Sequence, residues 1–178
     1  MDLVKFRRDC GEGDDESLVK AVWAIDQTVT TPDQAKSWLW ILIKRLLDTE
    51  RYSLAGLLLW GPDLWNPGPK AVRDVLRFVR CTQNMIVLGG AALGKTYTLV
   101  SFLLMDWLRD PDYTEIKVIS TTAGHAKSQS FSTLQRLYRA AIVPLPGLAM
   151  DAFIGLNPKD RHSAITLVGI PQGEDGRG

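Results

Sequence analysis

The feature that most constrains the fold is a glycine-bounded loop between a short apolar run and a helical segment. Residues 89–96 read Gly-Gly-Ala-Ala-Leu-Gly-Lys-Thr, which matches the Walker A pattern G-x-x-x-x-G-K-T. The apolar residues 85–88 predict a buried strand before this loop, and residues 96–108 predict a helix after it. Strand, loop and helix in this order form the context in which the pattern binds phosphate.

Each part of the loop has a role that follows from phosphate chemistry. Gly89 and Gly94 can adopt backbone angles that a Cβ disfavours, so the loop can wrap tightly and turn its N–H groups inward. The following helix adds the positive end of its dipole. We expect Lys95 to act on the β- and γ-phosphates as the catalytic cation, and the hydroxyl of Thr96 to ligate Mg²⁺. The predicted nucleotide-binding residues are Gly89, Gly90, Ala91, Ala92, Leu93, Gly94, Lys95 and Thr96. The alternative is a glycine-rich turn that matches the pattern by chance.

Composition sets broad limits on the class of protein. The 178 residues are 46% hydrophobic, which suits one domain or a domain with an attached helical region. Lys and Arg total 21 against 20 Asp and Glu, so any DNA-binding surface has to be local. Cys10 and Cys81 are far apart and indicate neither a disulfide framework nor a metal site. The apolar runs are too short to cross a bilayer and no signal peptide is evident, so we expect a soluble cytoplasmic protein.

Residues 1–66 predict an N-terminal helical region with loose first residues. Its helices are expected at 17–28, from Pro32 to about Asp48, and at 53–60. Thr31, Pro32 and Asp33 form a helix-start signal: a capping side chain, a proline in the first turn and an acid. The second helix is expected to bury Ala35, Trp38, Leu39, Leu42 and Leu46. Residues 61–69 are rich in proline and glycine, and are expected to break all regular structure as a linker.

Residues 67–178 predict part of a P-loop ATPase domain. Strands are expected at 115–120 and 164–170, with a helix at 125–141, and Pro111 is expected to end the helix after the loop near Asp110. A further helix at 69–80 carries a basic stripe, which consists of Lys70, Arg73, Arg77 and Arg80. The stripe could contact phosphates, or it could be a solvated face. The predicted fold class is therefore α/β: a P-loop NTPase core with a parallel sheet flanked by helices, preceded by a small helical region.

A second acidic element, which a P-loop hydrolase needs, is not evident. In such enzymes an apolar strand ends in Asp, which holds the Mg²⁺ shell, and usually in Glu, which orients water. Residues 103–106, Leu-Leu-Met-Asp, lie in the helix after the loop, and Glu174-Asp175 follows a glycine turn in reversed order. We therefore expect the chain to end before its Walker B strand.

The order of these features resembles the ATPase region of phage large terminase subunits, the motors that package DNA into capsids. The resemblance covers roughly residues 65–178. It depends on the loop at 89–96, Trp107-Leu-Arg-Asp-Pro, the strand and turn at 118–122, the helix start at 125–131, and the glycine- and arginine-bearing segment 168–178. The resemblance implies an additional-strand ATPase core, ATP with Mg²⁺, and movement of double-stranded DNA. It also implies a small terminase subunit and a portal protein as partners, a homo-oligomeric motor, and the host cytoplasm.

The resemblance also assigns further residues and shows one departure. Gln83 is the nearest candidate for the family's adenine-contacting glutamine. Many terminases carry an arginine within the phosphate loop, whereas this chain has Ala91 and Ala92 there, so that charge has to come from elsewhere.

Three alternatives to these assignments stay open. Thr121 and Thr122, followed by a helix with Lys127 and Arg136, either contact DNA or relay hydrolysis, or they only form a turn and a cap. The whole chain could instead belong to a helicase-like or other P-loop DNA translocase. It could also be a nucleotide-binding module that does not hydrolyse ATP.

Overall fold

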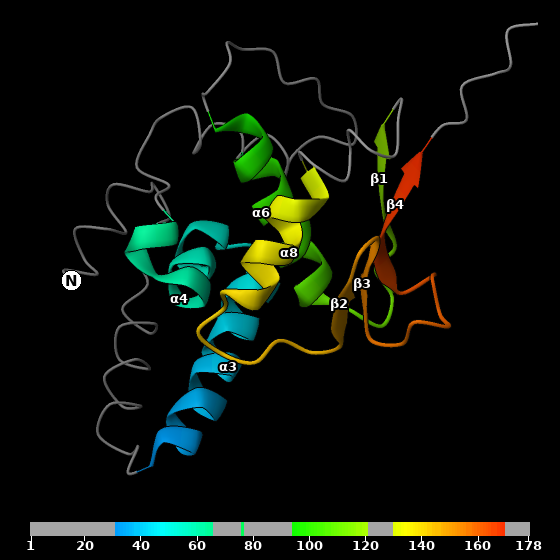
Figure 1. The fold of residues 1–178 in the computed structure, drawn as a ribbon. Helices are drawn as coiled ribbons and strands as arrows, with labels where there is room; N and C mark the ends of the chain where they lie inside the picture. The colour runs from blue at the N-terminus through cyan, green and yellow to red at the C-terminus, as the bar shows by residue number, and fades with distance from the viewer. Residues whose placement is uncertain (1–30, 66–75, 77–93, 121–129, 170–178) are drawn as a thin grey trace, which may run out of the picture.

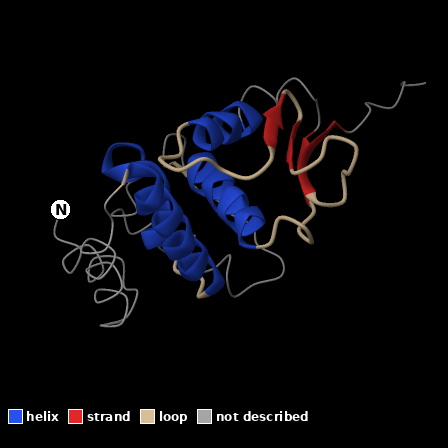
Figure 2. Cartoon of the chain, turned by 90° about the horizontal axis from the view of Figure 1, so that it is seen from below, coloured by secondary structure: helices blue, strands red, loops and turns tan. Residues whose placement is uncertain are grey.

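The computed structural model describes residues 31–65, 76, 94–120 and 130–169. Within these residues, helices form one side of the molecule and a small sheet forms the other (Figures 1 and 2). The elements are α3 (Pro32–Asp48), α4 (Tyr52–Leu64), α6 (Lys95–Arg109), β1 (Ile116–Ser120), α8 (Ser132–Arg139), β2 (Leu148–Met150), β3 (Phe153–Gly155) and β4 (Ala164–Gly169). The chain is thus mixed α/β. The predicted elements at 17–28, 69–80 and 85–88 lie outside the described residues, apart from Leu76, which is helical and buried.

The sheet is mixed, with the strand order β1-β4-β3-β2. β1 and β4 are parallel, with Ile116 opposite Ile165, and these two strands confirm the strands predicted from the sequence to within one residue at each end. β3 is antiparallel to both β4 and β2. The β2–β3 hairpin was not predicted, because its three-residue strands are too short to show an alternating pattern. The described sheet is therefore only partly parallel, where a parallel sheet was expected.

Gly147 lies directly before β2 and allows the chain there to approach the end of β3 closely. Its φ is +84°, and a Cβ at this position would lie 2.3 Å from the carbonyl oxygen of Gly155. Only glycine satisfies both the left-handed backbone and this approach.

α3 begins and ends where the sequence predicted. The side chain of Thr31 accepts a hydrogen bond from the backbone N–H of Gln34 at 3.3 Å, and Pro32 opens the first turn. The predicted burial is right for Leu42 and Leu46 but wrong for Trp38, which is 43% exposed. The reason is that the buried residues of α3 all lie in its C-terminal half, whereas its first turns extend away from the other helices (Figure 1).

α4 extends past the point where the sequence predicted its end. Gly61 breaks the helix with φ 72° and ψ 171°, but the chain then forms another helical turn to Leu64. Trp65 follows and is almost fully buried, with its indole N–H donating to the carbonyl of Ser53 at 2.9 Å. The prediction that all regular structure ends at Gly61 was therefore wrong, because tertiary packing of Trp65 holds this segment in place.

The start of α4 is joined to the end of α6 by a polar cluster. The Tyr52 hydroxyl lies 3.3 Å from a carboxylate oxygen of Asp106 and accepts a hydrogen bond from Arg109. Arg109 also forms ion pairs with Asp106 and Glu50, at 3.5 and 3.7 Å. Lys44 of α3 donates to the last carbonyls of α6, at Leu108 and Arg109. A cation at a helix C-terminus is favourable, so this contact stabilises the end of α6.

We predict that Gly56→Ala destabilises the protein, although alanine is the better helix former. A Cβ at residue 56 would lie 2.6 Å from the buried ring of Trp65. Overpacking of this kind costs about 1–3 kcal/mol. Urea denaturation followed by circular dichroism measures the change, with Lys36→Ala as an exposed-helix control expected within about 0.5 kcal/mol of wild type. Equal stability of both variants would contradict the packing of Trp65 on Gly56.

A second prediction concerns stability at alkaline pH. Burial, followed by the negative charge of Asp106, raises the pKa of Tyr52 to about 12 from 10.0, against the opposing effect of Arg109. The folded state holds this proton more tightly than the unfolded state does. The protonated hydroxyl therefore contributes stability that is fully present below pH 10 and is lost as the pH rises to about 12.

The measurement is the unfolding free energy of wild type and of Tyr52→Phe between pH 9 and 12. The phenylalanine variant has no proton to lose at this position. Wild type should therefore lose on the order of 2 kcal/mol more than the variant over this range. Parallel curves for the two proteins would show that the hydroxyl does not titrate as described.

Candidate functional site

The start of α6 is where the structure places the end of the Walker A pattern. Of the residues predicted for the site, Gly94, Lys95 and Thr96 are described. Gly94 is the N-cap, Lys95 is the first helical residue, and Thr96 is exposed to solvent in the first turn. The side chain of Lys95 lies outside the description. The remaining predicted residues also lie outside it: Gln83, Gly89, Gly90, Ala91, Ala92 and Leu93.

Gly94 has the left-handed backbone that favours glycine, with φ 69° and ψ 12°. A Cβ there would meet nothing within 4 Å, so the requirement for glycine comes from the backbone and not from a lack of space. Its carbonyl accepts two hydrogen bonds at 2.9 Å, from the backbone N–H and the hydroxyl of Thr98. Glycine has no side chain to cap the helix, so it leaves the N–H groups of the first turn without a side-chain acceptor of its own.

The site lies at the end of the molecule where the parallel strands end. In Figure 1 the first turn of α6 and the arrowheads of β1 and β4 point to the same end. In open α/β sheets, ligands bind beyond the carboxyl ends of parallel strands. The start of α6 and the ends of β1 and β4 therefore lie at the same end of the molecule.

The first turns of α6 are held by buried polar and aromatic contacts. Thr98 and Ser101 are buried, and the Ser101 hydroxyl donates to the carbonyl of Tyr97 at 2.7 Å. The Tyr97 hydroxyl donates to the carbonyl of Leu64, and its ring lies 6.5 Å from the ring of Trp65. The end of α4 thus contacts the helix turn that follows Lys95.

A positive charge lies near this turn. Burial raises the pKa of the Tyr97 hydroxyl, and the guanidinium of Arg136 partly offsets that rise. Arg136 is exposed on α8 and was one of the basic residues singled out in the sequence. Thr121, Thr122 and Lys127, which were singled out with it, lie outside the described residues, as does the basic stripe.

Sequence reasoning did not assign a role to the aromatic residues behind the site. The rings of Trp60 and Trp65 lie 5.6 Å apart, and the indole N–H of Trp60 donates to the carbonyl of Leu137 in α8 at 2.9 Å. Together with Tyr97, they form a continuous contact from α6 through α4 to α8. In the sequence, these two tryptophans lie close together near a glycine-proline pair. This spacing does not identify the residues that the tryptophans contact.

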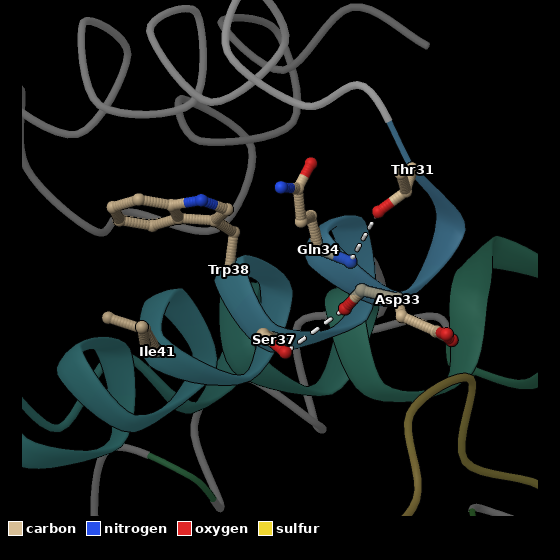
Figure 3. A pocket seen from close by; sticks show the side chains of 6 residues that line it. All are labelled: Thr31, Asp33, Gln34, Ser37, Trp38 and Ile41. Atoms are coloured by element: carbon tan, nitrogen blue, oxygen red, sulfur yellow. Dashed lines mark hydrogen bonds between the residues drawn. The ribbon is translucent and has the colours of Figure 1, made fainter.

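A hollow of about 280 Å³ lies on the first turns of α3 (Figure 3). It is lined by Thr31, Asp33, Gln34, Ser37, Trp38 and Ile41. The start of α3 and the start of α6 lie at opposite ends of the molecule in Figure 1. The hollow is therefore separate from the candidate site.

Within the described part of the chain, no three His, Cys, Asp or Glu side chains come together as a metal site. A magnesium ion bound mainly by phosphates and water does not need such a cluster, so Thr96 remains the predicted protein ligand. None of the helices described there is long and apolar enough to span a bilayer.

Comparisons of the chain with protein families, with curated proteins and with solved structures found no match.

The backbone of Gly94 leads to a prediction about stability. Gly94→Ala should cost about 1–2 kcal/mol, because an L-residue with a Cβ is disfavoured at φ 69° although space is available. Gly94→Asn should cost less, because asparagine tolerates the left-handed region. Urea denaturation of the two variants provides the test. If alanine were the better tolerated residue, the left-handed assignment would be wrong.

Proposed function

We propose that this chain binds ATP with Mg²⁺ at the start of α6. The observation that carries the proposal is the left-handed Gly94 that caps α6 directly before Lys95 and Thr96. The last three residues of the Walker A pattern are thus the N-cap and the first turn of a helix, which supports phosphate binding there.

The chemistry of the residues suits a polyphosphate. The first-turn N–H groups and the helix dipole favour an anion, and Lys95 adds a full positive charge. The exposed hydroxyl of Thr96 is a hard oxygen ligand, the type that Mg²⁺ prefers. When bound, Mg²⁺ supplies charge neutralisation on the phosphates. The positive charge of Arg136 acts on the hydroxyl of Tyr97, which follows Thr96 in α6.

We further propose that the chain is the ATP-binding part of a viral DNA-packaging motor, a large terminase subunit that couples ATP hydrolysis to movement of double-stranded DNA. The order of sequence features supports this reading over a general P-loop protein. The parallel pair β1–β4 is in keeping with such an ATPase core. Double-stranded DNA, a small terminase subunit, a portal protein and further copies of the chain are then its proposed partners.

The test of nucleotide binding is calorimetric titration of the chain with ATP and Mg²⁺. Wild type is expected to bind weakly and to hydrolyse ATP very slowly. Lys95→Ala should lose binding by tenfold or more, since a charge-assisted phosphate contact contributes roughly 1.5–3 kcal/mol. Lys117→Ala is the matched control, because Lys117 is an exposed lysine on β1, away from the first turn of α6.

The outcomes separate the readings. Loss of affinity in both lysine variants, or in neither, would reject the site at α6. Robust turnover by wild type that is lost in Lys95→Ala would contradict the expectation that a Walker B strand is missing. Repeating the titration with double-stranded DNA present should increase nucleotide affinity if the chain belongs to a DNA motor. No effect of DNA favours the nucleotide-binding module that does not hydrolyse ATP.

A further inference from the structure

α4 and α6 form an antiparallel pair that is joined at both ends by a tyrosine hydroxyl. At one end, Tyr52 of α4 contacts Asp106 near the end of α6. At the other end, Tyr97 of α6 donates to the carbonyl of Leu64 at the end of α4. The two contacts are chemically alike, but only that of Tyr97 lies beside the proposed nucleotide site, two residues after Lys95.

The segment that Tyr97 contacts is separated from the body of α4 by a break. Gly61 has φ 72° and ψ 171°, and the turn that follows it closes with a hydrogen bond from the N–H of Trp65 to the carbonyl of Gly61. Glycine in such a conformation can absorb a change of backbone angle with little steric cost. Gly61 is therefore the position at which the turn of residues 62–65, held against α4 by Trp65, can be displaced slightly at the lowest steric cost.

Movement of this turn would be passed on because its neighbours are closely packed. Trp65 is 2% exposed and contacts Trp60, which is hydrogen-bonded to α8 through Leu137. Gly56 supports the ring of Trp65 from the other side, with no room for even one added carbon. A displacement at Tyr97 cannot be absorbed by empty space, so the tryptophans have to follow it.

We infer that Tyr97 is a positioning residue that couples the nucleotide site to α4 and, through Trp60, to α8, by way of Leu64 and Trp65. This inference rests on the proposed binding of ATP. Phosphate attracts the first turn of α6 by its N–H groups, and the Tyr97 hydroxyl transmits the shift to the turn after Gly61. The same contact works in reverse, so α4 holds the first turn of α6 in position for the nucleotide.

The experiment uses the full chain labelled with 5-fluorotryptophan and observed by ¹⁹F NMR. Single Trp→Phe variants assign the signals of Trp65 and Trp38. ATP with Mg²⁺ is added while calorimetry measures binding separately. We expect the Trp65 signal to shift on binding and the Trp38 signal to stay, because Trp38 lies in the N-terminal half of α3 (Figure 3), and the start of α3 and the start of α6 are at opposite ends of the molecule.

Two matched variants then test the hydroxyl itself. Tyr97→Phe keeps the ring beside Trp65 and removes the bond to Leu64, and Tyr52→Phe removes the equivalent bond at the other end of the pair. Tyr97→Phe should weaken nucleotide binding about three- to tenfold, as expected for one lost hydrogen bond, and should reduce the Trp65 shift. Tyr52→Phe should leave both unchanged, although it also loses a tyrosine hydrogen bond between α4 and α6. A merely structural role would affect the two variants alike.

The experiment distinguishes failure of the proposed function from failure of the coupling. If calorimetry detects no binding by wild type, the proposed function falls and the coupling falls with it. If wild type binds ATP but the Trp65 signal does not move more than that of Trp38, the coupling is wrong while the proposed function stands. The same holds if the two phenylalanine variants have equal affinity. Should Tyr97→Phe not fold, the comparison of Trp65 with Trp38 in wild type still decides.

Discussion

The packing of Trp65 between α4 and α6 is the contact on which the described helices depend. The ring covers Gly56, contacts Trp60 and Tyr97, and donates its indole N–H to the carbonyl of Ser53. A tryptophan buries a large apolar area, and its single polar atom needs a partner when it is buried. Because all of these contacts are made by Trp65, the chain forms a further helical turn after Gly61 and packs against α6.

This pairing decides where the candidate site lies. α6 is held at its C-terminal end by the cluster of Tyr52, Asp106 and Arg109, with Lys44 of α3 on its last carbonyls. Near its N-terminal end it is held by Tyr97 and by the buried Thr98. In the first turn of α6, Thr96 is exposed to solvent. A helix that is held near both ends and exposes Thr96 suits the proposed binding site, because the binding groups are in place before the ligand arrives.

Local signals in the sequence predicted the elements whose ends are set by local chemistry. The bounds of α3 follow from Thr31 and Pro32, and α6 ends just before Pro111. The exposure of Trp38 could not be predicted, because periodicity shows which face is apolar but not how far along the helix its neighbours reach. The β2–β3 hairpin depends on pairing between short strands. The same holds for the candidate site: the motif pointed to Gly94, whereas the hydrogen bond of Tyr97 is to Leu64, which is distant in sequence.

The choice of glycine at the start of α6 argues for a ligand over a chance match to the motif. Serine, threonine, aspartate or asparagine caps a helix with a side-chain oxygen when the N-cap backbone is extended, but the backbone of Gly94 is left-handed. Gly94 has no side chain that could form such a cap, and its carbonyl is held by two hydrogen bonds from Thr98. The first-turn N–H groups, which have no side-chain cap from Gly94, are the donors that the proposed phosphate ligand would use.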